Sequence, residues 1–178
     1  MLEGLAFAVD PLDRLSYRRD DAGEVTRLRA RDDARAILIA RDMPLLLKAG
    51  GQLEPLMPIS EIARLGGARV EALMGVMPDG APVFAAMLSD EAVEEQSDSS
   101  DGFLDRRVLV VPGRDDLKLI DLRSIAAGGL VPPGPASMLG SAKALMHWHA
   151  RRRFCSNCGA LTAAAAAGWR RGWPSRRP

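Results

Sequence analysis

The sequence predicts an α/β (α+β) fold, with a mixed or antiparallel sheet in an N-terminal domain, then a helix, then a short cysteine knuckle. Three observations support this prediction. Continuous apolar runs at residues 36–40 and 44–47 are typical of buried strands. The turn signal Pro78-Asp79-Gly80 separates two further apolar stretches and indicates a hairpin. Beyond residue 135, apolar side chains recur at helical spacing, which indicates one amphipathic helix.

The expected strands follow one another along the chain and are bounded by turn residues. Residues 25–28 alternate apolar and polar side chains, as a half-buried strand does. The pair Gly50-Gly51 closes the apolar run that begins at Pro44. The full set of expected strands is 25–28, 36–40, 44–47, 70–76, 83–88, 107–111 and 117–120.

Three helices are expected. The first spans residues 60–65 with Ser60 as its N-cap, and the second begins at Asp121 and ends at Gly128. The third spans residues 136–150 and follows a Pro-rich stretch, residues 131–135, that we interpret as a stiff linker and internal boundary. The side chains that define its apolar face are Met138, Ala142, Leu145 and His149.

Composition and charge narrow the class of protein. The 178 residues are 47% hydrophobic, 26% charged and 4% aromatic, and the formal net charge is +1. These values are those of a globular chain and argue against a globally basic nucleic-acid binder. No apolar run approaches the ~20 residues that cross a bilayer. The first four residues carry no basic segment typical of a secretory signal, so we predict a cytoplasmic protein without membrane contact.

Both cysteines of the chain lie in one motif, Cys155-Ser156-Asn157-Cys158-Gly159. Two thiols in this spacing converge on one point, and the glycine permits the tight turn that aims backbone N–H groups at sulfur. In a reducing compartment such a pair is a metal half-site, a redox pair or a pair of idle thiols. We favour a half-site for Zn²⁺ with Cys155 and Cys158 as ligands, because the motif follows a helix and continues as a β-knuckle.

Two histidines precede the knuckle. His149 shares a helix face with Leu145, and His147 lies roughly opposite. Histidine is a common zinc ligand, but the helical residues between them and Cys155 point both side chains away from the knuckle. We interpret them as one half-buried and one exposed histidine.

The acidic residues 91–95, Glu-Ala-Val-Glu-Glu, have the spacing found inside the Nudix box, in which carboxylates on one helix face hold Mg²⁺. The rest of that signature is missing. The departures are Asp90 for Arg, Ser97 for Gly, Asp98 for an aliphatic residue and Pro82 for Glu. We therefore interpret residues 89–102 as a mobile, solvated surface loop.

The C-terminal residues 168–178 mix arginine and tryptophan, which suits phosphate contacts and base stacking. So short a segment without periodicity is more typical of a disordered terminus. We expect no nucleic-acid binding. The sequence also contains no dinucleotide-binding, Walker A, zincin or nucleophile-elbow motif.

Residues 142–162, with Trp148, Phe154-Cys155, Cys158-Gly159 and Thr162, resemble the entrance to the zinc ribbon of the NADH pyrophosphatases. These are the NAD⁺/NADH diphosphatases of the Nudix hydrolase superfamily. The resemblance implies an N-terminal α/β domain, a linker helix, a four-cysteine ribbon and a Nudix domain. It also implies homodimers and hydrolysis of NAD(H), and of NAD-capped RNA ends, with Mg²⁺ or Mn²⁺. We accordingly divide the chain into a Nudix-like domain at 1–131, a linker and helix at 132–150, and a partial zinc ribbon with an aberrant tail at 151–178.

The sequence departs from this family after the knuckle. Where the family has a second pair, Cys-Pro-x-Cys, this chain has Trp173-Pro174-Ser175-Arg176. Tryptophan and arginine do not ligate zinc, so the zinc ribbon is expected to be incomplete. No Nudix box follows in the sequence, which fits a frameshifted gene, a truncated gene or a degenerate paralogue. We favour truncation after a disrupted reading frame, because the match to the family fails abruptly rather than gradually.

We therefore expect the N-terminal and partial zinc-ribbon region of an NADH pyrophosphatase-like hydrolase, without diphosphatase activity of its own. We predict no catalytic and no cofactor-binding residue in the chain, and no bound Mg²⁺ or Mn²⁺. One alternative is a non-catalytic dimerisation or interaction module in which two chains pool Cys155 and Cys158 around one zinc ion. Another is a small redox protein with a reactive thiol.

Overall fold

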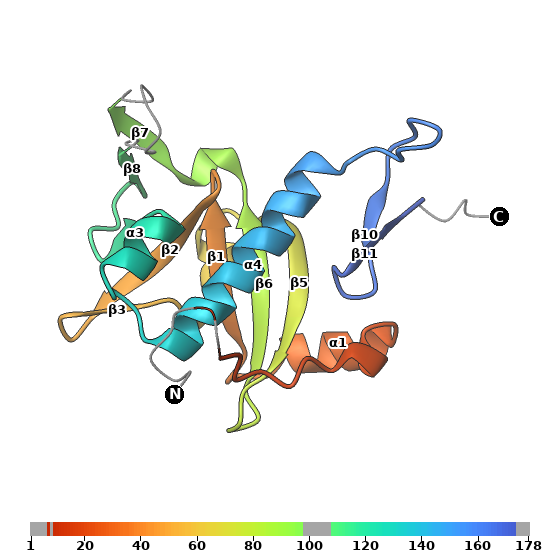
Figure 1. Cartoon of the computed structure of the whole chain (residues 1–178), viewed down its shortest axis with the longest axis horizontal. Coiled ribbons are helices and arrows are strands. Elements are labelled where there is room, and N and C mark those ends of the chain that lie inside the picture. The colour runs from red at the N-terminus through yellow and green to blue at the C-terminus, as the bar shows by residue number, and fades with distance from the viewer. Residues whose placement is uncertain (1–6, 8, 98–107, 174–178) are drawn as a thin grey trace.

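The computed structural model describes residues 7, 9–97 and 108–173 and has the mixed α/β fold that the sequence predicts (Figure 1). Its main sheet has seven strands, five of them in the order β3-β2-β1-β6-β5, while β4 pairs with β1 and β9 pairs with β2. The strands are β1 Arg35–Ala40, β2 Met43–Ala49, β3 Gln52–Glu54, β4 Met57–Pro58, β5 Ala68–Val76, β6 Pro82–Leu88 and β9 Leu117–Leu119.

The centre of the sheet is the parallel pair β1 and β6, whereas all other pairings are antiparallel. Strand β1 is buried on both faces, as its continuous apolar run predicts. The expected hairpin is formed by β5 and β6, which connect through the turn containing Gly80. Gly75 in β5 has a φ of +147°, and a Cβ atom there would lie 2.2 Å from the carbonyl oxygen of Asp13. Only glycine therefore allows the close pairing of Asp13 with β5.

Helix α4, Pro133–Arg151, crosses one face of the sheet (Figure 1). Its apolar face packs with Ile37 and Ile39 of β1, while Leu38 of β1 points into a second cluster on the other face with Ile62 of α2, Glu61–Arg64. Each fully buried leucine or isoleucine of this kind stabilises the fold by about 1.5–3 kcal/mol. The buried α4 side chains in the first cluster are Met138, Leu139, Ala142, Leu145 and Met146.

The prediction of a strand at residues 25–28 is wrong. These residues belong to helix α1, Ala22–Arg29, which follows the short 3₁₀ helix η1, Ser16–Arg18. The Asp21 side chain accepts a hydrogen bond from the Glu24 backbone N–H and caps the helix. Val25 and Leu28 lie in one cluster with Phe84 of β6, and a four-residue alternation is too short to distinguish this packing from that of a strand.

The two other predicted helices are confirmed in position. Ser60 precedes α2, but its side chain makes no capping hydrogen bond. Helix α3, Leu122–Ala127, is capped by Asp121, whose carboxylate accepts from the Ser124 N–H, and it ends before Gly128. The Pro-rich stretch forms less of a linker than expected, because α4 already begins at Pro133, and proline is favoured at the first helical positions.

The acidic segment is more ordered than the predicted loop. Residues Asp90–Ala92 form the 3₁₀ helix η2, and Glu94–Ser97 form strand β7, which pairs with β8, Val108–Val110. Val93 is 2% exposed and joins the cluster around Leu38, so its burial helps to hold the segment on the domain, together with the ion pairs Arg69–Asp90 and Arg41–Glu95. Residues 98–107, which include the remainder of the predicted loop and Arg107, lie outside the described residues.

The prediction of a disordered C-terminal tail is wrong for residues 168–173. Strands β10, Ala163–Ala165, and β11, Arg170–Gly172, form a hairpin whose connection docks on β5. The Trp169 indole N–H donates to the Leu73 carbonyl (2.6 Å), and the Leu73 N–H donates to the Ala167 carbonyl (3.0 Å). These contacts satisfy backbone groups at the open edge of the sheet. Residues 174–178 lie outside the described residues.

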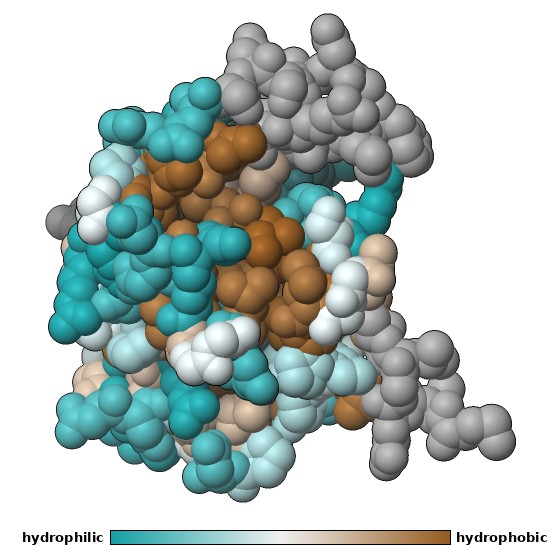
Figure 2. Space-filling model, turned by 90° about the vertical axis from the view of Figure 1, so that its left-hand side faces the viewer, coloured by the Kyte–Doolittle hydropathy of each residue, from teal (hydrophilic) through white to brown (hydrophobic). Residues whose placement is uncertain are grey.

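Apolar surface gathers on the side of the molecule where β2, β3 and β9 lie (Figure 2). The half-buried side chains of these strands that pack against the core are Leu47, Leu53 and Leu119, so the core reaches the surface at this edge. Among the described helices, none has the length and apolar character needed to cross a membrane.

Candidate functional site

The cysteine knuckle follows directly from the end of α4. The Cys155 N–H donates to the Ala160 carbonyl (2.8 Å), and the Gly159 N–H donates back to the Cys155 carbonyl (2.9 Å). Gly159 has a φ of +70°, which is the conformation that the tight turn requires. Phe154 and Leu161 pair across the base of the knuckle. The local backbone thus has the form that the sequence predicts.

The knuckle favours a thiolate at Cys155. Backbone N–H groups of Cys158 and Asn157, together with the Cys158 thiol, lower the pKa of the half-buried Cys155. Cys158 itself is exposed. A thiolate serves both metal ligation and redox chemistry, so this environment suits either of those interpretations better than idle thiols.

The two thiols fit one half of a zinc site. Zn²⁺ in structural sites takes four ligands, and the described part of the chain contains no group of three or more His, Cys, Asp or Glu side chains that could hold a metal ion. Trp173, at the position of a family ligand, is 66% exposed, and Arg176 lies outside the described residues. The assignment of Cys155 and Cys158 as zinc ligands therefore stays a prediction, and the other ligands would have to come from elsewhere.

His149 is engaged in the fold. It is 1% exposed, whereas the sequence suggests a half-buried side chain. Its Nε2 lies 2.7 Å from the Gly168 carbonyl oxygen, and its Nδ1 lies 2.9 Å from Arg171 Nη1. Because a guanidinium only donates, Nδ1 accepts and Nε2 carries the proton. Burial lowers the pKa of His149; the hydrogen bond to Gly168 opposes this effect, and the Arg171 charge lowers the pKa further.

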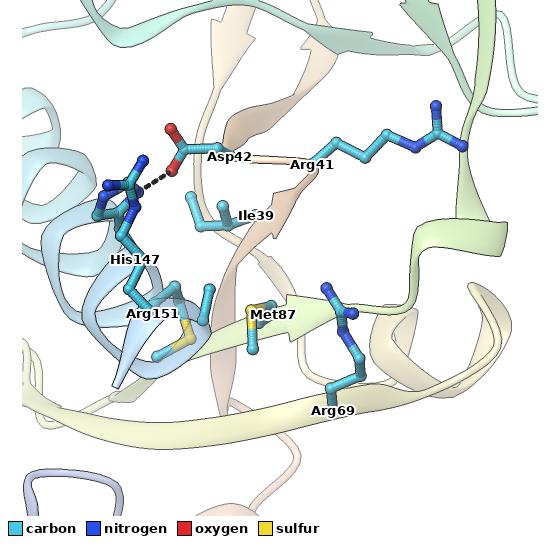
Figure 3. Close-up of a pocket in the computed structure, with 9 residues that line it drawn as sticks. Ile39, Arg41, Asp42, Arg69, Met87, His147 and Arg151 are labelled. Atoms are coloured by element: carbon cyan, nitrogen blue, oxygen red, sulfur yellow. Dashed lines mark hydrogen bonds and ion pairs between the residues drawn. The ribbon is translucent and has the colours of Figure 1, made fainter. Parts of the chain in front are cut away.

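His147 lies at a pocket of about 360 Å³ that the sequence did not reveal (Figure 3). Its Nδ1 is 3.1 Å from Asp42 Oδ1. Figure 3 shows His147 and Arg151 on the α4 side, Arg69 on the β5 side, and Ile39 and Met87 between them. The pocket is lined by Ile39, Arg41, Asp42, Arg69, Met87, Met146, His147, Ala150 and Arg151.

The pocket lies at the C-terminal ends of β1 and β6. Because these two strands run parallel, the segments that follow them leave the sheet at the same end. After β1 the chain turns through Arg41 and Asp42, and after β6 it continues into η2, where Asp90 lies. The sequence signal was weak: two polar residues between two apolar runs. Their proximity to Arg69 and Arg151 depends on sheet order, which residue patterns do not show.

The Nudix-like carboxylates do not share one helix face. Glu91 lies in η2, whereas Glu94 and Glu95 are consecutive residues of β7 and point to opposite sides of that strand. Glu95 is also paired with Arg41 at 3.3 Å. These three residues therefore do not fit a Mg²⁺ site of the Nudix type.

The fold and these sites define a mixed α/β domain joined by its last helix to a cysteine knuckle and a two-stranded hairpin. A family model described as "NADH pyrophosphatase-like rudimentary NUDIX domain" matches residues 33–148, from just before β1 to the last turns of α4. The chain belongs to this family, which confirms the predicted resemblance. A search of curated proteins gave no match to the sequence. The division at residues 131 and 150 stays a prediction.

Proposed function

We propose that this chain provides the rudimentary NUDIX domain and a zinc-binding half-site for an NADH pyrophosphatase-like hydrolase, and that it does not itself hydrolyse NAD(H). The observation that supports this proposal is the position of the Nudix-like carboxylates. Glu91, Glu94 and Glu95 are divided between a 3₁₀ turn and a strand, and Arg41 already pairs with one of them. Metal-assisted cleavage of a pyrophosphate needs carboxylates that converge on the same ion.

The test is direct. The purified chain is incubated with NADH and Mg²⁺ or Mn²⁺, and release of AMP is measured against a protein-free blank. We expect no release above the blank. Release of AMP above the blank would overturn the proposal. If that release disappeared when Glu91, Glu94 and Glu95 were all changed to Gln, these carboxylates would be the ones that hold the catalytic metal.

A second proposed role is a zinc-linked homodimer. Cys158 is exposed, and the knuckle carries two exposed apolar side chains, Phe154 (60% exposed) and Leu161 (54%). Exposed apolar residues around a half-complete ligand set suit contact with a second copy, since two knuckles together supply the four thiolates of a structural zinc site.

Zinc content and native mass distinguish these states. One zinc ion per dimer, lost together with the dimer in Cys158→Ser, supports the shared site. A metal-free monomer contradicts it and leaves the thiols for redox chemistry. That third role requires Cys155 to react with an alkylating agent faster than an ordinary thiol at neutral pH, and slow alkylation would exclude it.

A further inference from the structure

The side chain of Arg171 joins three parts of the C-terminal region. Its Nη1 donates to Nδ1 of His149 at 2.9 Å, and His149 belongs to α4. Its Nε donates to Thr162 Oγ1 at 2.9 Å, and its Nη2 donates to the Thr162 carbonyl oxygen at 2.5 Å. Arg171 itself lies in β11. One guanidinium thus fastens the hairpin and the chain that follows the knuckle to the end of α4 (Figure 1).

Thr162 closes the base of the cysteine knuckle. Its backbone N–H and its hydroxyl both donate to the Arg153 carbonyl oxygen, each at 2.9 Å. These two residues lie on either side of the two cysteines in the sequence. Because Arg171 holds Thr162 by two hydrogen bonds, the guanidinium also fixes the orientation of the knuckle on the domain. We name the knuckle and the hairpin together, residues 154–172, the C-terminal lobe.

The anchor of Arg171 on α4 is a neutral histidine. His149 is 1% exposed, its Nε2 lies 2.7 Å from the Gly168 carbonyl oxygen, and its Nδ1 accepts from Arg171. A protonated imidazole has no acceptor. Protonation at Nδ1 therefore removes the hydrogen bond from Arg171 and places two cations in contact. The contact that fastens the C-terminal lobe exists in only one protonation state of His149.

The surroundings of His149 do not compensate a second proton. A cavity of about 310 Å³ lies against the ring, and its charged lining residues are Arg69, Arg153 and Arg171; none of the described residues that line it is acidic. Arg69 is already paired with Asp90 at 3.0 Å. A buried charge without a counter-ion is strongly unfavourable, and burial, together with the Arg171 charge, lowers the pKa of His149. Proton uptake is therefore favoured once the C-terminal lobe has left α4.

We propose that His149 and Arg171 form a proton-operated latch for the C-terminal lobe. At neutral pH the latch is closed and holds the lobe on α4 and β5. As the pH falls, His149 takes up a proton, Arg171 leaves it, and the lobe is released while the main sheet stays folded. Release changes the orientation of Cys155 and Cys158 relative to the domain. The inference does not rest on the proposed function, because the position of the lobe is measured on the metal-free chain.

Hydrogen exchange of two backbone amides, measured by NMR on the full chain, follows the latch. The Leu73 N–H donates to the Ala167 carbonyl and reports docking of the hairpin, whereas the Thr162 N–H reports the base of the knuckle. Since His149 in the released lobe has the ordinary pKa of about 6.5, both protection factors should fall about five- to tenfold between about pH 7.5 and pH 5.5. The amide of Leu38 in β1, at the centre of the sheet, should stay more strongly protected at each pH.

Two histidine variants separate the latch from other effects of pH. His149→Gln keeps one acceptor and one donor but does not titrate. In this variant, the protection of Leu73 and Thr162 should no longer depend on pH. His147→Gln is the matched control, since the His147 side chain lies on the same helix, is 41% exposed and pairs with Asp42. It should retain the response of the parent chain.

Two arginine variants test the other half of the latch. Arg171→Gln should open it at every pH and lower the protection of Leu73 and Thr162 by about thirtyfold or more at neutral pH, because charge-assisted hydrogen bonds are lost. Arg170→Gln breaks only an exposed pair with Asp20 and should change the protection by less than about fivefold. Thr162→Val removes only the hydroxyl and should lower the protection of Leu73 by about fivefold, so the test remains available if Arg171→Gln does not fold.

Four results would overturn the proposal. The first is protection of Leu73 and Thr162 that does not change with pH in the parent chain. The second is the same change in His149→Gln, which would assign it to another group. The third is equal protection of Leu73 and Leu38, which would show that the lobe leaves the sheet only when the whole domain unfolds. The fourth is an equal effect of Arg171→Gln and Arg170→Gln. Circular dichroism verifies that each variant is folded.

Discussion

The Nε2 atom of His149 lies 2.7 Å from the carbonyl oxygen of Gly168, and this hydrogen bond joins the last turns of α4 to the connection between β10 and β11. On the other side of the ring, Arg171 donates to Nδ1. The donation from Arg171 requires a neutral imidazole, because Nδ1 accepts only when it carries no proton, whereas the Gly168 carbonyl can accept from either form. A second proton would place an N–H against a guanidinium, so the junction between the domain and its C-terminal hairpin depends on pH.

The first prediction concerns this pH dependence. Since the pKa of His149 is lowered in the folded chain, the unfolded chain takes up a proton first as the pH falls. The contribution of His149 to the free energy of unfolding is therefore complete above the ordinary histidine pKa of about 6.5. It declines below that pH until the folded pKa is passed, by at most about 1.36 kcal/mol per pH unit.

Urea unfolding at a series of pH values between 8 and 5 measures this slope. His149→Gln should remove the contribution of this residue, whereas His147→Gln should retain it. If the slope between pH 7 and pH 5.5 is the same in His149→Gln as in the parent chain, His149 is not its source.

The second prediction concerns Gly168. Its φ is +87°, and a Cβ atom there would lie 2.4 Å from the Cβ of Ala72 in β5. Gly168→Ala should displace the hairpin from the sheet edge and cost about 1–3 kcal/mol of unfolding free energy. Gly172→Ala is the control, because a Cβ atom there meets nothing within 4 Å. Equal stability of the two variants would contradict the docking.

The third prediction concerns Trp169, which donates from its indole nitrogen to the Leu73 carbonyl and stacks under Arg19 at 3.9 Å. Trp169→Phe keeps a ring for Arg19 but leaves the carbonyl without this donor. We expect a loss of about 1–2 kcal/mol in urea unfolding. Trp173→Phe, at a 66% exposed position, should stay within about 0.5 kcal/mol of the parent. A larger loss for Trp173 would mean that the hairpin packs through its other end.

The fourth prediction concerns Glu61, which is 5% exposed and pairs with Arg114 at 2.9 Å and with Arg64 at 2.5 Å. Arg114→Ala leaves a buried carboxylate with one exposed partner, and we expect a loss of about 2–4 kcal/mol. Arg31→Ala breaks an exposed pair with Asp33 and should cost less than about 1 kcal/mol. Similar losses in the two variants would show that Glu61 is hydrated.

The same carboxylate contributes to acid sensitivity. Burial alone would raise the pKa of Glu61, but the hydrogen bonds from Arg114 and Arg64 outweigh it and hold the pKa below its ordinary value. This contribution is present above the unfolded pKa of about 4.3 and is lost as the pH falls through the lower folded value. Acid unfolding of Glu61→Gln should accordingly lack this part of the pH dependence.

Much of the fold was predictable from the sequence because its signals are local. The apolar run of β1, the turn between β5 and β6, and the 3.6-residue period of α4 each lie within one element. The backbone of the cysteine knuckle is local too, since Gly159 provides the required turn. The helix α1 was missed because its apolar pattern spans four residues, and its cap, Asp21, lies before them.

The pocket of Figure 3 was not predictable for the opposite reason. Arg69 and Arg151 are far apart in sequence, and they meet only because β5 borders β6 and α4 crosses the sheet beside them. No residue pattern contains that strand order. The same holds for the docked hairpin, where Trp169 and Gly168 fit against β5 through contacts nearly 100 residues apart in sequence.

By itself, the sequence determined the α/β class, most of the strands, the amphipathic helix and the family to which Cys155 and Cys158 point, because periodicity and short motifs act over neighbouring residues. Only the tertiary structure decided that His149 is buried as a neutral side chain between α4 and the C-terminal hairpin, that the Nudix-like carboxylates diverge, and that Arg41 and Arg69 share a pocket with Arg151 of α4. Those properties arise from long-range packing, in which burial and charge depend on residues that the chain brings together only on folding.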